Sequence, residues 1–146
     1  MQVEVRIDSS VTEPKVIILT DKMTEEVSGI VRILSENEPR MIAGIKDENV
    51  KILELNDIMR VYSSGGKVYA VTASDEYIVR RRLYEMEEIL KGKMFARISN
   101  SEIINLKKVK NFDLSFSGTI CVKMNDGSST YVSRRYVSRI KEVLGL

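Results

Sequence analysis

The chain has 146 residues, of which 43% are hydrophobic and 30% are charged, and its formal net charge is +2. This length supports one full domain with a core, with or without an appendage, and the composition is that of a globular protein. The sequence has no histidine and a single cysteine, which excludes imidazole-based metal sites and triads, internal disulfides and cysteine clusters. We therefore expect no metal and no cofactor.

The longest uninterrupted apolar run is the short segment 16–19. A membrane-spanning helix needs about 20 apolar residues, and no secretory hydrophobic segment is present. We expect a cytoplasmic protein that does not enter a membrane. Cys121 lies in the alternating run 119–124, which favours a small buried side chain over a nucleophile.

Charge is distributed unevenly along the chain. Residues 1–50 hold six Lys or Arg and ten Asp or Glu, whereas residues 91–146 hold eleven Lys or Arg and four acidic residues. A basic C-terminal part on a nearly neutral chain favours a polyanionic partner that meets one region of the molecule. A solvated charged surface is the alternative, and charge alone does not separate the two.

Residues 1–40 predict a small ββα appendage. Val3, Val5 and Ile7 alternate with polar residues, which is typical of a half-buried strand, and the run 15–20 predicts a second, buried strand. A helix capped by Thr20 or Asp21 follows, and Pro39 within the segment 36–40 marks its end. Its apolar positions have helical spacing: Met23, Val27, Ile30, Val31 and Leu34. These elements bury too little area to be stable alone, so we expect them to pack on the main domain or on a second copy.

Residues 41–146 predict a mainly β domain of the α+β class. Short strands are separated by turns at residues 47–49, 63–66 and 74–75. Gly65 and Gly66 fit a hairpin turn better than a phosphate-binding loop. Helical spacing predicts one helix that stops at Gly92 and a last helix capped by Ser133, with inward side chains from Val137, Ile140, Val143 and Leu144. The order of elements gives no sign of a parallel sheet.

Two segments, 97–106 and 131–140, share a pattern. In each, a run suited to a strand gives way to hydroxyl, amide and guanidinium side chains, and then to an apolar helical pattern. We expect strand-to-helix corners, where backbone N–H groups are unpaired and the helix dipole favours anions. Two such corners on a basic domain predict a surface that holds phosphates, and hence a DNA-binding domain.

Three separated motifs carry a more specific signal. They are DIMRVYSSGGKVYAVT with the later LYEMEEIL, then FARISNSEIINLKKV, then GTI followed by YVSRRYV. In this order and spacing they resemble the LytTR family of bacterial DNA-binding domains, over residues 41–146. The resemblance implies small antiparallel sheets with two helices. It also implies a sequence-specific transcriptional regulator that binds double-stranded DNA at promoter direct repeats and reads the major groove with loops.

The resemblance also implies roles for single residues. Base contacts fall on Lys67, Asn100 and Arg135, with Gly66 as an alternative to Lys67. An asparagine amide suits the edge of adenine, and arginine can grip guanine O6 and N7 together. Many family members have His where this chain has Ser99, which removes a donor. Phosphate contacts fall on Arg97, Ser101 and Ser133, to which we add Arg134.

Simpler roles stand beside these. Asn100 could satisfy backbone groups at a turn, and Ser99 or Ser101 could cap a helical turn. Arg135 and Arg139 could form a solvated helix face, and Asn105, between core residues, is expected to be structural. Other basic residues could supply only general attraction to a polyanion: Arg80, Arg81, Arg82, Lys107, Lys108 and Lys110.

We predict a regulator that is not an enzyme and has no small-molecule substrate. The receiver domain usual in the family has no room in residues 1–40, and we expect the appendage to pair two copies into a homodimer. One rival is a basic protein-interaction module with only non-specific affinity for DNA. The other is a small hydrolase, for which Asp57, Asp75 and Glu76 lie near turns without forming a paired set.

Overall fold

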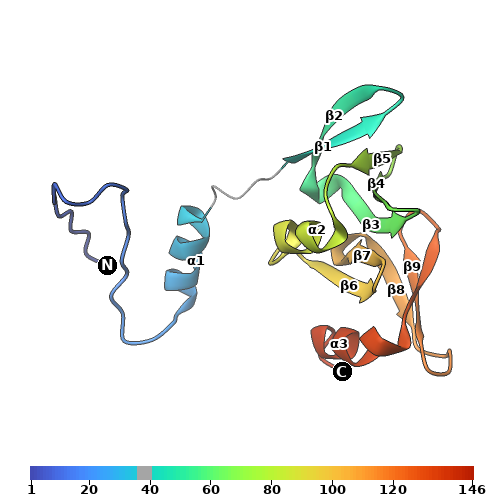
Figure 1. The fold of residues 1–146 in the computed structure, drawn as a ribbon. Coiled ribbons are helices and arrows are strands. Elements are labelled where there is room, and N and C mark those ends of the chain that lie inside the picture. The colour runs from blue at the N-terminus through green and yellow to red at the C-terminus, as the bar shows by residue number, and fades with distance from the viewer. Residues whose placement is uncertain (36–40) are drawn as a thin grey trace. The chain divides into compact units, whose positions relative to one another are not determined.

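The computed structural model describes residues 1–35 and 41–146. The chain divides into two units, residues 1–37 and 38–146. In the described part, the first unit holds one helix, α1 (Glu25–Leu34), and the second holds ten strands and two α-helices (Figure 1). The boundary predicted at 36–40 lies outside the described residues.

Helix α1 forms where the apolar spacing predicts a helix, but its cap differs. The Thr24 hydroxyl accepts a hydrogen bond from the Val27 N–H at 3.2 Å, and Glu25 and Glu26 lie in the first turn, where the helix dipole favours them. The prediction of Thr20 or Asp21 as the cap is therefore wrong by about one turn.

The two strands predicted before α1 do not form in the described residues. Residues 1–24 contain no strand, and Val3, Val5 and Ile7 are 85%, 82% and 97% exposed. Leu19, in the run predicted to be buried, is 92% exposed. A strand persists only when a neighbour pairs its backbone groups and covers its apolar face, and a single copy of this segment supplies neither.

A seven-stranded antiparallel sheet forms most of the second unit. Its strand order is β2-β1-β5-β4-β3-β7-β6. The strands are β1 (Met41–Lys46), β2 (Asn49–Glu54), β3 (Ile58–Ser64), β4 (Lys67–Thr72), β5 (Glu76–Val79), β6 (Phe95–Ser99) and β7 (Glu102–Asn105). The prediction of a mainly antiparallel β domain is confirmed.

A second, three-stranded antiparallel sheet follows in the order β10-β9-β8. Its strands are β8 (Val109–Asp113), β9 (Ile120–Met124) and β10 (Ser129–Val132). Helix α2 (Leu83–Leu90) contacts β3, and helix α3 (Arg134–Val143) contacts β6 and β10. Two short 3-10 helices, Leu55–Asp57 and Leu106–Lys108, lead into β3 and β8.

The buried side chains form two clusters that meet at β7. Ile103 belongs to the cluster under α2, and Ile104 belongs to the cluster between the second sheet and α3. Successive side chains of a strand point to opposite faces, so β7 is buried on both sides. Cys121 on β9 is buried as well, as its alternating run predicts.

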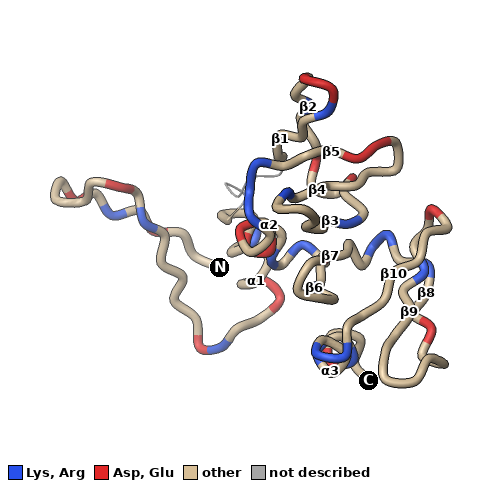
Figure 2. The backbone as a smooth tube through the Cα atoms, turned by 45° about the vertical axis from the view of Figure 1, so that its right-hand side comes forward, with Lys and Arg blue, Asp and Glu red and all other residues tan. Residues whose placement is uncertain are grey.

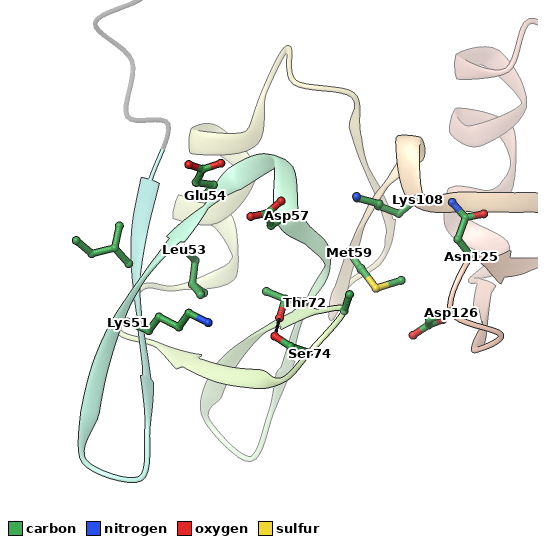
Figure 3. Close-up of a pocket in the computed structure, with 12 residues that line it drawn as sticks. Lys51, Leu53, Glu54, Asp57, Met59, Thr72, Ser74, Lys108, Asn125 and Asp126 are labelled. Carbon is green, nitrogen blue, oxygen red and sulfur yellow. Dashed lines mark hydrogen bonds between the residues drawn. The ribbon is translucent and has the colours of Figure 1, made fainter.

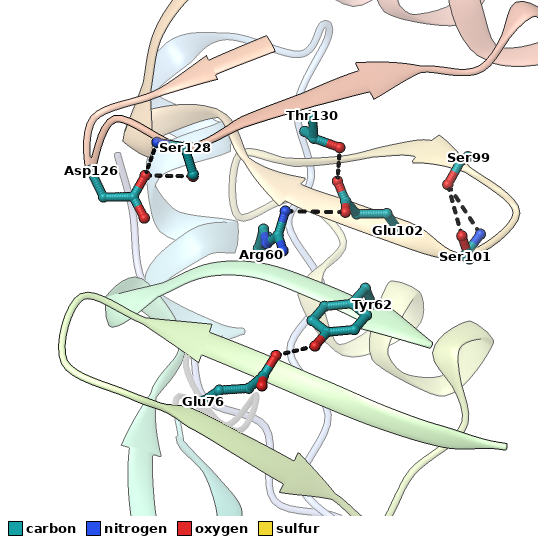
Figure 4. Close-up of polar contacts among 9 residues, drawn as sticks. All are labelled: Arg60, Tyr62, Glu76, Ser99, Ser101, Glu102, Asp126, Ser128 and Thr130. Carbon is teal, nitrogen blue, oxygen red and sulfur yellow. Dashed lines mark hydrogen bonds and ion pairs between the residues drawn. The ribbon is translucent and has the colours of Figure 1, made fainter. Parts of the chain in front are cut away.

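A polar contact also joins the two sheets. Glu102 on β7 accepts a hydrogen bond from Thr130 on β10 at 2.6 Å and pairs with Arg60 on β3 at 3.5 Å (Figure 4). Because the Glu102 side chain is only 13% exposed, this contact holds one edge of the second sheet against the first.

One of the predicted corners and one predicted core position are wrong. Residues 99–101 form a hairpin turn between β6 and β7 and do not lead into a helix, because the short run 102–105 pairs with β3 and β6. A short apolar run fits either a strand or a helix, and its neighbours decide which. Val143, predicted to face inward on α3, is 53% exposed, whereas Ile140 is buried as predicted.

Candidate nucleic-acid interface

Backbone hydrogen bonds connect three turns of the second unit. The Ser63 N–H, just before the β3–β4 turn, donates to the Ser101 carbonyl in the β6–β7 turn at 2.8 Å. The Ser133 N–H, at the β10–α3 corner, donates to the Ile98 carbonyl of β6 at 2.9 Å. We call residues 63–67, 99–101 and 133–135 the turn surface.

The turn surface brings together the three residues for which sequence predicts base contacts. Lys67, Asn100 and Arg135 are all exposed, and each comes from a different turn. Sequence alone left open whether the three lie on one side of the molecule. The structure places them on adjoining turns, and their contacts with bases stay a prediction.

The β3–β4 turn is built by two glycines. Gly65 and Gly66 have φ angles of +58° and +76°, which L side chains adopt at a cost, and Ser64 pairs with Lys67 across the turn. This is the geometry of a tight two-residue hairpin. A Cβ added at Gly66 would meet nothing within 4 Å, so the backbone here is open to close approach by a ligand.

The β6–β7 turn has its own internal bonds. The Ser99 hydroxyl accepts a hydrogen bond from the Ser101 N–H at 3.2 Å, so Ser99 caps a hairpin turn and not the helical turn considered from sequence (Figure 4). The Asn100 side chain bonds no backbone group in the described residues. Its Oδ1 accepts a hydrogen bond from the Tyr136 hydroxyl of α3 at 3.2 Å, which leaves the amide near the surface.

Arg97 is more enclosed than a phosphate contact requires. Its side chain is 14% exposed, and its guanidinium donates to the carbonyls of Ser99 and Asn100 at 2.8 and 2.6 Å. The third guanidinium nitrogen pairs with Glu87 of α2 at 2.5 Å. The phosphate contact at Arg97 stays a prediction, and the bonds that Arg97 makes here all run inside the protein.

The β10–α3 corner presents two arginines at a helix start. Ser133 occupies the cap position of α3, but its side chain makes no capping hydrogen bond. Arg134 and Arg135 are exposed, and the first turn of α3 contains no acidic residue. A helix N-terminus disfavours cations, so an anion bound here would gain from both the arginines and the dipole.

Two sets of contacts lie beside this corner, one at a glycine and one at Arg139. Gly118, in the β8–β9 loop with φ +74°, lies so close to Arg134 that an added Cβ would approach its Nε at 3.3 Å. Arg139, one turn along α3, pairs with Glu87 at 3.4 Å and lies over the Tyr136 ring. Arg139 therefore makes contacts within the protein while 59% of its side chain stays exposed.

A further basic group at this end comes from β5. Val79 pairs with Val68 at the start of β4, which places the following Arg80 and Arg81, both exposed, beside the β3–β4 turn. Figure 2 shows Lys and Arg along this connection and on α3. From sequence we expected these arginines to supply only general attraction to a polyanion. The strand register that brings them beside Lys67 joins residues far apart in the chain, so local patterns did not reveal it.

The opposite end of the strands carries a hollow of about 670 Å³ (Figure 3). It is lined by residues of β2, the β4–β5 turn and the β9–β10 turn, including Lys51, Ser74, Lys108 and Asp126. Lys108 and Lys107 follow the far end of β7, and Lys108 borders this hollow. The basic segment at 107–110 therefore lies away from the turn surface.

In the described residues, no helix is long and apolar enough to cross a membrane. The same part of the chain holds no group of three or more Cys, Asp or Glu side chains arranged to bind a metal ion.

Comparison with known proteins gives a family and a fold. Residues 48–145 match the family model described as the LytTr DNA-binding domain. Relatives named as uncharacterized HTH-type transcriptional regulators occur in Staphylococcus aureus. One, from strain COL, is 30% identical over 147 residues, which cover 100% of this chain and 99% of the relative. Another, from strain MRSA252, is 29% identical with the same coverage.

A solved LytTr DNA-binding domain from Bacillus cereus has the same fold. It aligns with a TM-score of 0.71 and 20% sequence identity, over 74% of this chain and 99% of that domain. The fold similarity agrees with the family match, which covers the three turns and both helices of the second unit. The chain belongs to the LytTR family of DNA-binding domains.

Proposed function

We propose that this protein is a transcriptional regulator that binds specific sequences of double-stranded DNA, and that the turn surface reads bases in the major groove. The observation that carries the proposal is the pair of backbone bonds, Ser63 to Ser101 and Ser133 to Ile98. They hold three exposed polar side chains on adjoining turns, as simultaneous contact with one duplex requires.

The three side chains supply different chemistry. Arg135 offers a planar fork for guanine O6 and N7, and the Asn100 amide offers a donor and an acceptor to adenine. Lys67 offers a single cationic donor beside an open glycine backbone. Together they could distinguish several base pairs, which a uniformly basic surface could not do.

Phosphate contacts would supply most of the affinity. Ser101, Ser133 and Arg134 lie on the turn surface next to the base-reading residues, and Arg80 and Arg81 extend the positive charge past Lys67. Each phosphate neutralised releases counterions, so binding should weaken steeply with salt.

The arrangement of helices favours reading by turns. Five strands separate α2 from α3 in sequence, so these two helices do not form the consecutive pair of a helix-turn-helix. Relatives that match the whole chain carry the name of transcriptional regulators, which supports a regulatory role in the bacterial cytoplasm. A binding protein, and not an enzyme, fits this site.

We also propose that the first unit pairs two copies into a homodimer on direct repeats. Its apolar residues at alternating positions 3, 5 and 7 are more than 80% exposed, and such a segment is stabilised when another strand pairs with it. The Staphylococcus aureus relatives match over this unit too, so it recurs together with the DNA-binding domain.

Selection of bound duplexes from genomic fragments, followed by footprinting, tests the function. The wild-type protein should protect a defined site, and Arg135→Ala should lose about 1–3 kcal/mol of discrimination at one base pair. Lys141→Ala, at an exposed position in the last turn of the same helix, is the matched control and should keep the discrimination. Weak binding that is indifferent to sequence would instead indicate a protein-interaction module.

A further inference from the structure

Arg97 makes an unusual set of contacts for a residue expected to hold DNA. Its Nε donates to the Ser99 carbonyl at 2.8 Å, and its Nη2 donates to the Asn100 carbonyl at 2.6 Å. The guanidinium is a rigid planar fork, so two bonds to successive carbonyls fix the direction of the peptide between them. That peptide belongs to the turn that carries the Asn100 side chain.

Glu87 holds the guanidinium from the other side. Its Oε2 accepts from Arg97 Nη1 at 2.5 Å, and its Oε1 lies 3.4 Å from Arg139 Nη2. Hydrogen bonds between two charged groups are about twice as strong as neutral ones. Helix α2, which carries Glu87, is anchored by the buried side chains of Leu83, Met86 and Leu90, so the carboxylate sits on a fixed element.

All three nitrogens of the Arg97 guanidinium therefore have acceptors inside the protein. These bonds use three of the five N–H donors, so a phosphate could meet only the two that remain, on a side chain that is 14% exposed. Tyr136 completes the arrangement, because its hydroxyl donates to Asn100 Oδ1 and so fixes which end of the amide donates.

We propose that Glu87 and Arg97 are positioning residues that hold the β6–β7 turn in the geometry needed for base reading, and that Arg97 is not a phosphate contact. This inference deepens the proposed function and rests on it. Glu87 gives the turn a fixed shape before DNA arrives, and a preorganised contact loses less entropy on binding.

Hydrogen exchange in the DNA-free protein tests the positioning role by itself. Arg97→Ala and Glu87→Ala should speed exchange of the amides at 99–101 by about tenfold, the equivalent of one hydrogen bond to a charged group. Exchange in β9, within the core, should stay unchanged. If Arg97→Ala loosens the whole domain, Arg97→Lys serves in its place. Lysine keeps the charge but lacks the planar fork that bonds both carbonyls, so this variant should loosen the turn alone. Unchanged exchange at 99–101 in these variants would overturn the proposal.

DNA binding separates positioning from phosphate contact. Arg97→Ala should lower the ratio of site to non-site affinity by about five- to hundredfold and leave the salt dependence unchanged. Arg134→Ala is the matched control, because it removes the same charge from an exposed position of the turn surface and should reduce the salt slope by about one. A reduced slope with an unchanged ratio in Arg97→Ala would make Arg97 a phosphate contact and overturn the inference.

Glu87→Ala gives an independent test, because it should change non-site affinity and the affinity ratio in opposite directions. Loss of a negative charge should raise affinity for non-site DNA, while the loosened turn should lower the ratio of site to non-site affinity. A parallel rise in both affinities with an unchanged ratio would show that Glu87 only repels DNA, which contradicts the inference. If the wild-type protein prefers no site, the proposed function fails, and hydrogen exchange still decides whether the pair holds the turn.

Discussion

Two asparagines, one in the turn before β7 and one at the end of β7, have different surroundings. Asn105 is 1% exposed, and its side chain donates to the Ile58 carbonyl at 2.9 Å and accepts from the Lys107 N–H at 3.0 Å. Asn100 is exposed and bonds only the Tyr136 hydroxyl through its side chain in the described structure. Burial and satisfied hydrogen bonds make Asn105 structural, as its place between core residues predicts.

Substituting each asparagine should separate stability from recognition. Asn105→Ala removes the side-chain partner of the buried Ile58 carbonyl and of the partly buried Lys107 N–H. It should lower the free energy of unfolding by about 1–3 kcal/mol with no change in preferred base. Asn100→Ala should change the preferred base and leave the free energy of unfolding unchanged. Urea unfolding and competition between duplexes measure the two effects. A changed base preference in Asn105→Ala would contradict this assignment.

The Tyr62 hydroxyl should ionise at a higher pH than an ordinary tyrosine. Its hydroxyl donates to Glu76, and this hydrogen bond, with burial, raises the pKa of Tyr62 to about 12 from the usual 10 (Figure 4). The raised pKa means that folding favours the neutral phenol. Its contribution to stability is complete below pH 10 and is lost as the pH rises from 10 to about 12.

Ultraviolet absorbance of tyrosinate measures this directly. The wild-type protein should show one tyrosine that ionises near pH 12, and Tyr62→Phe should lack that step. Tyr84→Phe, at a residue that is 63% exposed, serves as the control and should retain the ionisation near pH 12. Ionisation of Tyr62 near pH 10 would show that the Glu76 bond does not persist in solution.

At the scale of elements, two hairpins use the same tight turn with different residues. The β3–β4 turn has Gly65 and Gly66, whereas the β1–β2 turn has Asp47 and Glu48 at φ +49° and +65°. A left-handed backbone costs an L side chain about 1–2 kcal/mol, and glycine adopts it freely. Sequence predicted both turns, but only the β3–β4 turn has residues that adopt this backbone freely.

Matched substitutions at the second turn position should have opposite effects. Gly66→Ala should lower the unfolding free energy by about 1 kcal/mol through backbone strain, since its Cβ would meet no other atom. Glu48→Gly should raise it by up to about 1 kcal/mol by relieving the same strain. Thermal unfolding compares the two, and a change of the same sign in both would refute the explanation.

Sequence patterns predicted local elements better than long-range partners. Alternation, turn residues and helical spacing found the hairpins, α2 and α3 within a few residues of their ends. The run 102–105 was misassigned because its four residues fit two periods, and pairing with β3 and β6 decided the outcome. The strands predicted before α1 failed because pairing requires a partner that the single chain does not supply.

The candidate site was predicted in part. Residue types and motifs singled out Lys67, Asn100 and Arg135, and the structure places all three on the turn surface. Two features needed the structure: the β4–β5 register that brings Arg80 and Arg81 beside Lys67, and the bond from Glu87 to Arg97. Each joins residues that no local pattern connects.

At the scale of the whole molecule, the first unit makes a prediction about assembly. If exposed apolar residues at positions 3, 5 and 7 pair with a second copy, sedimentation should give a dimer at micromolar concentration, with or without DNA. Val5→Asp places a charge in that segment and should give monomers. Glu4→Asp, at the neighbouring exposed position, should remain dimeric. A wild-type monomer under both conditions would refute the proposed pairing.

The central claim is that one end of the second unit, the turn surface, meets DNA. Amide chemical shifts followed by NMR during titration with a selected duplex test it most directly. The account predicts large changes at residues 63–67, 99–101 and 133–135 together, and little change at residues 72–74 and 125–126, which border the hollow at the other end. Changes confined to the hollow, or to one of the three turns alone, would contradict it.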